Sequence, residues 1–542
     1  MHSGVLRHYW YLLVLAPVAI QLFFALHRLK NCWDDGAITT AFSRTWAETG
    51  RIALTPGSPI VEGFSSVTWF LLVSLPYFFS HQPDAGVVWT KVLSAIFGLL
   101  SLRVMYLIAW RQFSDRAAAI VSVLLLACSY TTVMEVENGM EMNLAVFLLL
   151  LLFHVLTADR VKGRVLYASA VSFLLLLTRF EIPFTLLLLF FGVLYAAYRR
   201  RPGAMSLRDL SGIAIATILS FVVMALWRHH EFGVWMPNTI YAKSFIPYRD
   251  WSTPAKFLAT RLKAMAEPIQ IFGIPILIAL AVWIRAIYRK EPSLTRFGRI
   301  HPAVFLLALG CFLFGAAFGQ NWGYAGRMVA PMIPFLILAV VGICFSSVTD
   351  TLLLKKIFVV LLVVQGLLWL RYVVRPLWVI SMKTIEPLGV GADSVRSALR
   401  QDRLVVMMSD VGSSSLCCDR LDIIDSGFLA DPTLAHTGWQ GFAPYFRQVR
   451  PELVEAHSFW AEGSGIYEHG LLDDYSIVAS NGIRFFLRND LYNRLVDEHA
   501  GSVLPVTSAP ACVPPLPNDA RFSLSKRTCL VLNAPTKNRN FQ

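Results

Sequence analysis

The sequence is poor in charged residues. Asp, Glu, Lys and Arg make up only 15% of the 542 residues, whereas a typical soluble chain carries about 25%. The mean hydropathy is correspondingly high, at +0.56. Long apolar runs fill most of the chain before residue 376, which excludes an ordinary soluble protein. The composition therefore indicates a protein that crosses a membrane several times.

Other familiar signals are missing too. The first apolar run, 9–27, has a positively charged flank but no small-residue cleavage site, so it predicts a retained helix rather than a removed signal peptide. The eight cysteines form no metal-binding pattern. Cys512 and Cys529 would be able to pair if their region is exported, although spacing alone leaves this open. The chain also contains no Gly-rich phosphate loop, no nucleotide-sugar motif and no internal repeat.

Apolar runs long enough to cross a bilayer, about 17–25 residues once short ones are extended, occur eleven times. They cover 9–27, 87–110, 117–134, 142–158, 165–179, 183–198, 211–228, 269–287, 302–318, 327–346 and 354–373. The run 65–80 has a shorter apolar part and is interrupted by Pro76, so it predicts a helix lying at the interface.

The net charge of +13 orients these spans rather than indicating nucleic-acid binding. With the N-terminus inside, the loops that carry an excess of Lys and Arg all fall in the cytoplasm, as the positive-inside rule requires. They are 111–116, 158–164, 199–209, 285–299 and the turn with Lys355 and Lys356. Counting 65–80 as a full span would move every later loop to the opposite side of the membrane and remove this agreement with the positive-inside rule. The C-terminus is therefore expected outside the membrane.

Residues 376–542 form a separate polar unit of ordinary domain size. "RLVVMMSD" and "RLDIIDSG" predict strands that end in turns, and Asn481-Gly482 predicts a hairpin. We expect a small α/β domain outside the membrane that binds an acceptor. Its aromatic residues offer faces for sugar stacking, although any one of them more often belongs to a core. They include Trp439, Phe442, Tyr445, Phe446, Phe459, Trp460 and Tyr467.

Two adjacent carboxylates, Asp34 and Asp35, follow the first apolar run. Apolar residues recur at helical spacing after them and Gly50 ends the pattern, which predicts an amphipathic helix over 37–49 on the membrane surface. Asp35 is placed to cap this helix. Because a cap needs only one carboxylate, capping leaves the second carboxylate unexplained. A carboxylate whose pKa is raised by partial desolvation can accept a hydroxyl proton.

The predicted topology brings further polar residues to the same outer face. They are Glu62, Ser65, Glu137, Asn138, Glu141, Arg179, Glu181, Asn238, Tyr241, Lys243, Trp322, Tyr324 and Arg327. Singly, each has an ordinary explanation as a helix cap, a headgroup contact or part of an aromatic belt. Together they favour a functional site, since a charge at membrane depth costs roughly 2.5–3.5 kcal/mol. The acids suit a base and sugar hydroxyls, and the cations suit a phosphate leaving group.

A series of motifs occurs in one order along the chain: "DDGAITTAFSR", "PGSPIVEGFSSVTW", "ENGMEMNLAVF", "LTRFE", "MPNTIYAKS", "GRMVAPMIP" and "SDVGSSS" with Asp410. In these motifs the chain resembles the GT-C class of glycosyltransferases. It is similar to the bacterial arabinofuranosyltransferases that use a polyprenyl-phosphate arabinose donor. The likeness is closest to the mycobacterial enzymes that add terminal β-arabinofuranose and to related pilin-arabinosylating enzymes. Two positions depart from the family pattern: Gly36 replaces a larger residue, and Phe180 stands where proline is common.

The resemblance implies an α-helical polytopic GT-C fold with about 11 transmembrane helices, interfacial helices and a C-terminal α/β periplasmic domain. It divides the chain into a catalytic membrane domain, 1–375, and a periplasmic domain, 376–542. The first outer loop, 28–86, would carry the catalytic aspartate, and 229–268 would form another outer loop. It places the protein in a bacterial cytoplasmic membrane, with a lipid-linked sugar donor and a glycan or glycoprotein acceptor as partners.

The resemblance also implies roles for the polar residues. Asp34 or Asp35 would be catalytic. The donor and its phosphate would be bound by Arg44, Arg179, Lys243, Arg327, Tyr241 and Asn238. The substrates would further contact Glu62, Glu137, Asn138, Glu141, Glu181, Trp322 and Asp410. Neither a nucleotide nor a dedicated metal site is expected, although a divalent cation bridging the aspartates and the phosphate remains open.

The expected reaction transfers a pentofuranosyl group from a polyprenyl phosphate to an acceptor hydroxyl outside the membrane. Inversion or retention depends on whether one or two carboxylates work, which stays open here. The main alternative is a related enzyme that moves mannose or aminoarabinose. A flippase is disfavoured because the acids lie at one face and the two halves do not match. A ligase for lipid-linked glycans is a further alternative.

Overall fold

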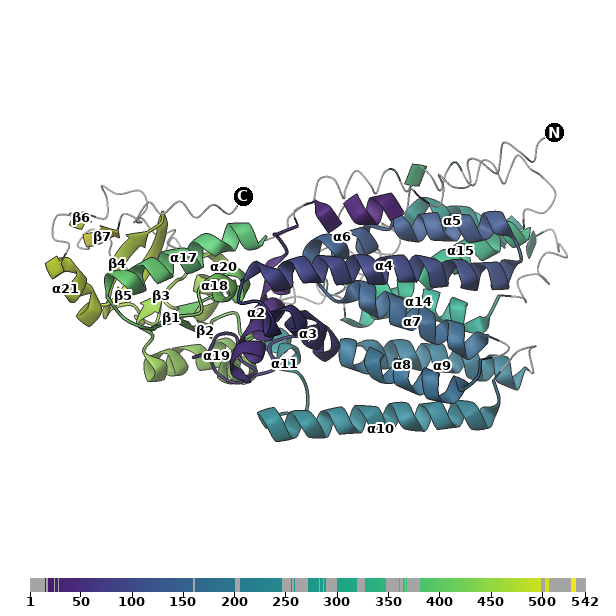
Figure 1. Cartoon of the computed structure of the whole chain (residues 1–542), viewed down its shortest axis with the longest axis horizontal. Coiled ribbons are helices and arrows are strands. Elements are labelled where there is room, and N and C mark those ends of the chain that lie inside the picture. Colours follow the sequence, from purple (N-terminus) through teal and green to yellow (C-terminus); the bar gives the residue numbers. More distant parts are fainter. Residues whose placement is uncertain are drawn as a thin grey trace.

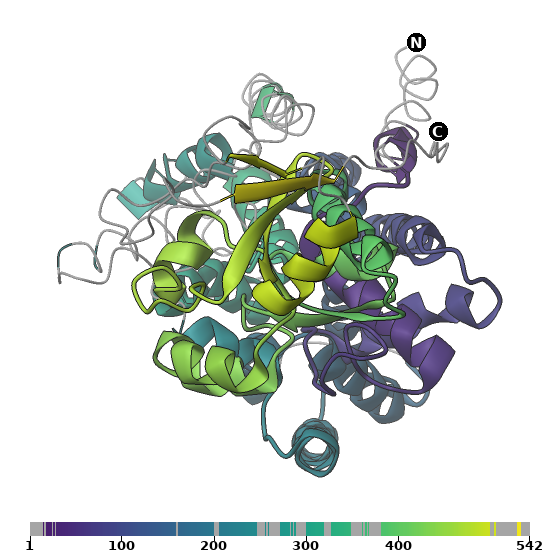
Figure 2. The same ribbon diagram turned by 90° about the vertical axis from the view of Figure 1, so that its left-hand side faces the viewer.

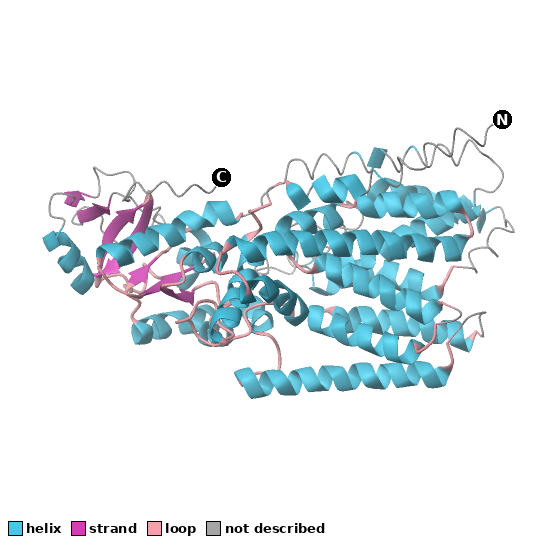
Figure 3. Cartoon of the chain, in the orientation of Figure 1, coloured by secondary structure: helices cyan, strands magenta, loops and turns pink. Residues whose placement is uncertain are grey.

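The computed structural model places a helical bundle at one end of an elongated molecule and a mixed α/β domain at the other (Figure 1). Figure 3 shows the same division, with all strands gathered in the α/β domain. Apart from isolated positions and short pieces, the structure describes residues 31–158, 161–199, 205–245, 272–281, 300–318, 327–347, 381–498, 503–505 and 528–532.

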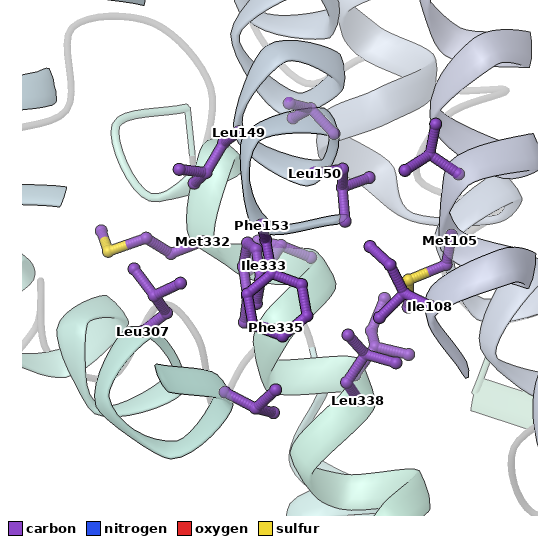
Figure 4. Packing of buried hydrophobic residues seen from close by; sticks show 14 of the residues in the cluster. Met105, Ile108, Leu149, Leu150, Phe153, Leu307, Met332, Ile333, Phe335 and Leu338 are labelled. Carbon is purple, nitrogen blue, oxygen red and sulfur yellow. The ribbon is translucent and has the colours of Figure 1, made fainter. Parts of the chain in front are cut away.

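Apolar helices form the bundle. They are α4 (Asp84–Phe113), α5 (Arg116–Ala127), α6 (Tyr130–Asn138), α7 (Met142–Thr157), α8 (Arg164–Thr178), α9 (Ile182–Tyr198), α10 (Leu207–Phe232), α14 (Pro302–Phe318) and α15 (Ile333–Ser347). At the centre, the rings of Phe153 and Phe335 pack edge to face, with centroids 5.3 Å apart. Leu149, Met105 and Leu338 close around them (Figure 4).

Membrane crossing is supported most directly by two helices of the described part. The helices α4 and α10 are each long and apolar enough to span, and α5 with Thr131–Asn138 forms a third candidate bent by 41°. The other apolar helices of this part are shorter. The predicted spans 9–27, 269–287 and 354–373 lie wholly or partly outside the described residues, so the count of eleven stays a prediction.

The helix α10 stands apart from the rest of the bundle. It packs mainly on α8, and only 17% of its apolar window is buried. Figure 2, which looks onto the α/β domain, shows α10 end-on and separated from the other helices. Its exposed apolar residues suit contact with lipid.

Short elements connect the two ends of the molecule. They are α2 (Asp34–Thr49), α3 (Val67–Ser74), the 3-10 helix η1 (Leu75–Phe78) and α11 (Asn238–Phe245). The predicted interfacial run 65–80 is thus a short helical segment in the structure. Most residues of α2 are buried, because α3 packs on one side and the α/β domain on another. The expected surface helix is therefore an internal one.

The start of α2 also differs from the prediction. The helix begins at Asp34, its N-cap is Trp33 and no side chain caps it, so the prediction that Asp35 caps the helix is wrong. Both aspartates lie in the first turn, where carboxylates interact favourably with the helix dipole. The predicted glycine stop is confirmed, since Gly50 ends α2 in the left-handed conformation with φ 74°.

The α/β domain contains one seven-stranded mixed sheet in the order β2-β1-β3-β5-β4-β7-β6. Its strands are β1 (Leu404–Met408), β2 (Leu421–Asp425), β3 (Leu453–Val454), β4 (Tyr475–Ser480), β5 (Ile483–Arg488), β6 (Val503–Pro505) and β7 (Thr528–Leu532). Its helices are α17 (Met382–Ala398), α18 (Val411–Cys417), α19 (Pro432–Val449), α20 (Ser458–Ser464) and α21 (Asn489–Glu498).

The strands predicted from the sequence are confirmed as β1 and β2, which pair in parallel. The hairpin is confirmed as β4 and β5, with Asn481 at φ 53° and Gly482 at φ 73° in its turn. Cys417 and Cys418, which are adjacent in the sequence, form a disulfide, and no pattern in the sequence predicts it. Cys529 is disulfide-bonded, while its predicted partner Cys512 lies outside the described residues.

Candidate active site

A cavity of about 380 Å³ lies where the helical bundle meets the α/β domain. Its volume is within the range of small-ligand sites, about 300–1,000 Å³. The first turn of α2, the start of α7, α11 and Arg327 form its walls on the membrane side. The turn after β1, the loop after β2 and the segment entering α20 form the opposite wall. Its charged lining residues are Asp34, Asp35, Glu141, Lys243, Arg327, Asp410, Asp425 and His457.

Asp34 is held by the α/β domain. Its Oδ2 accepts the backbone N–H of Gly412 at 3.1 Å, and its Oδ1 accepts that of Ser413 at 2.8 Å. A Cβ atom on Gly412 would lie 2.2 Å from the carbonyl oxygen of Asp34, so only glycine permits this approach. Burial raises the pKa of Asp34 to about 7, against the lowering effect of the N–H group of Ser413.

Asp35 faces the cavity and pairs with a cation of the bundle. Its side chain is 35% exposed, and its Oδ2 accepts a hydrogen bond from Nη1 of Arg327 at 3.1 Å. The Arg327 guanidinium also lies 5.0 Å from the centroid of the Trp33 ring, within cation–π range. The two aspartates thus differ in environment, since Asp34 contacts backbone donors and Asp35 a guanidinium.

A buried charge network lies behind the cations. Arg179 donates hydrogen bonds to both Glu141 and Glu181, and all three side chains are almost fully buried. Lys243 lines the cavity close to this network. Burial lowers the pKa of Lys243 to about 8, with further lowering by Arg327 and Arg179. Glu141 lines the cavity as well, while Arg179 and Glu181 support it from outside.

The α/β domain contributes a second set of charged groups. Nε2 of His457 lies 3.2 Å from Oδ2 of Asp410, and Nδ1 lies 2.8 Å from Oε2 of Glu455. Burial alone would lower the pKa of His457, but these two carboxylates raise it to about 10. The imidazole is therefore a cation at neutral pH. Asp425 lies nearby, and its carboxylate accepts the N–H groups of Gly427 and Ala430 at 2.7 and 2.8 Å.

Several residues predicted to bind the donor instead join the two parts of the molecule. Nδ2 of Asn238 donates to the carbonyl oxygens of Phe428, Leu429 and Asp431 at 3.2, 2.9 and 3.2 Å. The Tyr241 ring lies against His436 with centroids 4.1 Å apart. Neither residue lines the cavity.

Arg44 and Glu62 also lie away from the cavity lining. Arg44 donates to Glu48 and to the carbonyl oxygen of Leu416 at 3.1 and 3.0 Å, which ties α2 to the end of α18. Glu62 accepts two hydrogen bonds from Arg228 of α10 at 2.7 and 3.0 Å. Its neighbours in sequence, Gly63 to Ser65, do line the cavity.

The remaining predicted residues lie behind the α2 start or cannot be placed. Glu137 and Asn138 are buried at the end of α6 and do not line the cavity. The Asn138 carbonyl oxygen accepts the N–H of Trp33 at 3.3 Å. A Cβ on Gly36 would lie 2.5 Å from that oxygen, which explains the glycine at this position. Trp322 lies outside the described residues.

Sequence reasoning did not single out Asp425, Glu455 or His457. The segment "VEAHSFW" shows only a histidine two residues after an acid, a pattern too common to indicate a site. Within the described part of the chain, no three His, Cys, Asp or Glu side chains are grouped as for a metal ion.

No family model and no curated protein sequence matches the chain. Solved structures do match it. ArnT from Cupriavidus metallidurans bound to undecaprenyl phosphate superimposes with a TM-score of 0.56 at 15% identity, over 89% of this chain and 98% of that one. The apo oligosaccharyltransferase of Archaeoglobus fulgidus gives 0.52 at 12% identity, over 86% of this chain and 73% of that one. The fold is that of the GT-C glycosyltransferases.

This likeness confirms the GT-C fold that the sequence resemblance implied, with a mainly helical membrane part and a smaller C-terminal sheet. At 15% identity it extends to the fold alone.

Proposed function

We propose that the chain transfers a pentofuranosyl group, D-arabinofuranosyl, from a polyprenyl phosphate to a glycan or protein acceptor. The reaction takes place on the outer face of a bacterial cytoplasmic membrane. One observation carries the proposal: a single cavity brings the carboxylates of Asp34 and Asp35 together with the cations of Lys243 and Arg327. The ordered motifs shared with arabinofuranosyltransferases support a pentofuranosyl donor.

Lys243 and Arg327 bind the donor phosphate in this proposal, because cations stabilise the charge that grows on a departing phosphate. Arg179 and its two glutamates keep the surrounding wall rigid. The prenyl chain lies along α3 and the segment after it, where Leu71, Leu75, Phe78 and Phe79 are exposed. The presence of undecaprenyl phosphate in the ArnT structure supports a polyprenyl donor for this fold.

Asp34 acts as the general base. It takes the proton of the acceptor hydroxyl while that oxygen attacks the anomeric carbon of the donor. The bond from the anomeric carbon to the phosphate oxygen breaks, and its electron pair leaves with the phosphate. A raised pKa suits this role, because a base works best when its pKa is near the working pH. Asp35 orients Arg327, and one displacement with a single base inverts the anomeric centre.

The acceptor enters from the α/β side of the cavity. Phe459 and Trp460 line this wall and offer aromatic faces, and Asp410 offers a carboxylate to hydroxyl groups. The two walls therefore differ in their roles, since the bundle holds the donor and the α/β domain holds the acceptor.

A transfer assay with the purified protein in lipid nanodiscs tests the proposal. Polyprenyl phosphates carrying arabinofuranose, mannose or aminoarabinose are supplied with membrane glycan acceptors, and transferred sugar is measured. We expect transfer from the arabinofuranosyl donor. Preferred use of mannose or aminoarabinose would replace the donor assignment, and no release of polyprenyl phosphate from any donor would contradict the enzyme.

Variants of the two aspartates test the mechanism. Asp34→Asn is expected to lower the transfer rate about 10²–10⁴-fold, the usual contribution of a general base. Protein abundance and donor binding should stay near wild type. Glycan analysis of cells carrying each variant gives an independent readout, in which Asp34→Asn removes a pentose. An equal loss of protein abundance would instead indicate a structural role.

A further inference from the structure

The α/β domain holds one histidine through both of its ring nitrogens. Glu455, which is nearly buried, binds Nδ1 of His457, and Asp410 binds Nε2. Two carboxylates on one imidazole stabilise its protonated form, in which both nitrogens donate. His457 lines the cavity but has no ring nitrogen left to accept a proton. His457 is therefore expected to act through the residues that it contacts.

Asp410 is the N-cap of α18 and has φ 54°, a left-handed conformation that a non-glycine residue adopts only when its surroundings support it. Its side chain makes no cap hydrogen bond to α18 and is directed to His457 instead. Val411 follows, and the next two residues are Gly412 and Ser413, whose N–H groups donate to the carboxylate of Asp34. The left-handed Asp410 thus makes the histidine contact itself, and only Val411 separates it from the donors that bind Asp34.

We infer that His457 is a positioning residue for Asp34: by anchoring Asp410, it fixes the left-handed turn that presents the N–H groups of Gly412 and Ser413 to the Asp34 carboxylate. The catalytic part of this inference rests on the proposed function, in which Asp34 is the base. The structural part does not. It states that the anchor on the α/β domain orders the contact with α2.

The charged groups around Asp34 determine how its pKa responds when the contact between His457 and Asp410 is lost. Asp35 and Asp410 act directly on Asp34 and raise its pKa. The other charged groups that line the same cavity are His457, Asp425, Glu141, Lys243 and Arg327. The N–H groups of Gly412 and Ser413 lower the pKa of Asp34, whereas burial and Asp410 raise it. A turn that loosens weakens the lowering contribution, so the acidic limb of the rate profile moves to higher pH.

The experiment compares His457→Ala and the milder His457→Gln with wild type, in full-length protein in nanodiscs. His469→Ala is the matched control, since His469 is an exposed histidine of the same domain. Hydrogen exchange of the segment 411–417 reports the Asp34 contact without any substrate. Transfer rates over a pH series report the acidic limb.

We expect His457→Ala to speed exchange of the Gly412 and Ser413 amides at least about tenfold, to lower the transfer rate, and to move the acidic limb up by about one pH unit. His457→Gln should give smaller changes in the same direction, and it decides the matter if the alanine variant does not fold. His469→Ala should match wild type.

Unchanged exchange in the two His457 variants overturns the inference. A shifted pH profile without faster exchange also overturns it, because His457 would then act through its charge alone. If wild type transfers no sugar, the proposed function fails, yet the exchange measurement still decides whether His457 orders the turn.

Discussion

At the scale of single residues, most charged side chains of the site already have a hydrogen-bond or ion-pair partner within the protein. Among the described residues, Lys243 is the exception. Asp34 accepts hydrogen bonds from backbone N–H groups, and Asp35 accepts one from Arg327. Arg179 forms ion pairs with two glutamates. Lys243 has no carboxylate of the described residues within ion-pair distance. A half-buried ammonium of this kind is suited to bind an anion from outside the protein.

Donor affinity should therefore depend on pH through Lys243. The pKa of Lys243 is lowered to about 8, so its positive charge is present below this pH and is lost as the pH rises through it. We expect the donor KM to rise above about pH 8. Lys243→Arg should keep a low KM to higher pH, because arginine stays charged.

The measurement is the donor KM across a pH series for both proteins. Lys383→Arg, which changes an exposed lysine of α17, serves as the control and should follow the wild-type curve. A wild-type KM that stays constant through pH 9 would exclude Lys243 as the phosphate ligand.

At the scale of elements, α2 is the part on which both halves converge. It packs on the connecting helix α3, on α4 of the bundle, and on α17 and α18 of the α/β domain. Its residues Ala37, Ile38 and Phe42 share one buried apolar cluster with Val406 and Leu416 of that domain. Two glycines make this possible, because Gly36 lets α2 approach the end of α6 and Gly412 lets α18 approach α2.

Gly36→Ala should strain this packing. The new Cβ would lie 2.5 Å from the carbonyl oxygen of Asn138, a backbone atom that cannot move aside independently. We expect a loss of about 1–3 kcal/mol in stability, the usual effect of overpacking. Thermal unfolding in detergent measures it. Gly212→Ala on α10, where a Cβ would be 3.8 Å from its nearest neighbour, should leave the midpoint unchanged or raised.

The pair of Glu62 and Arg228 should hold α10 to the loop before α3. Both side chains are largely buried, at 1% and 11% exposure, and breaking a buried pair costs about 3–5 kcal/mol. Arg228→Ala should therefore lower the unfolding temperature and raise hydrogen exchange at the loop around Glu62. Arg208→Ala at the exposed start of α10 is the matched control and should change neither.

At the scale of the whole molecule, side chains of the membrane part grip backbone atoms of the α/β domain. Asn238 holds three carbonyl oxygens of the loop after β2, and Ser58 donates to the carbonyl oxygen of Ile423 at 2.8 Å. Arg44 holds the end of α18. The cavity lies between these contacts, so its shape depends on the docking of the two parts.

Asn238→Asp should weaken this docking. A carboxylate would replace an amide donor that faces three carbonyl oxygens, and like partial charges would repel one another. We expect faster hydrogen exchange over 427–434 and at least about a tenfold lower transfer rate. The same change at Asn493, which is exposed on α21, should have no effect. Normal exchange in Asn238→Asp would contradict a docking role.

The parts of the fold that were predicted correctly from the sequence depend on local sequence signals. The glycine stop after α2, the strands β1 and β2 and the hairpin at Asn481-Gly482 follow from spacing and turn chemistry within a few residues. Asp34, Asp35, Lys243 and Arg327 were singled out from the motifs, and all four line one cavity. Prediction weakened where a side chain's partner is remote, since Arg44 and Leu416 are 372 residues apart and Asn238 and Phe428 are 190 apart.

The capping prediction failed for the same reason. Asp35, which was predicted to cap α2, instead accepts a hydrogen bond from Arg327, 292 residues away. Its neighbour Asp34 accepts helical N–H groups, but those of α18 rather than those of its own helix. Nothing in the segment around Asp34 identifies a partner 378 residues away. His457 was missed because its role depends on Glu455 and Asp410 together, and only the folded domain brings the three side chains into contact.

The hydrogen bonds from Gly412 and Ser413 to Asp34 have a consequence for the protein during its synthesis. Translation runs from the N-terminus, so Asp34 is synthesised long before residues 411–417. Until these residues have folded, the base of the proposed mechanism would lack its backbone donors, and the proposed acceptor site would lack one wall. In the proposed mechanism, a partly translated chain is therefore expected to be inactive towards a lipid-linked donor until the α/β domain has folded.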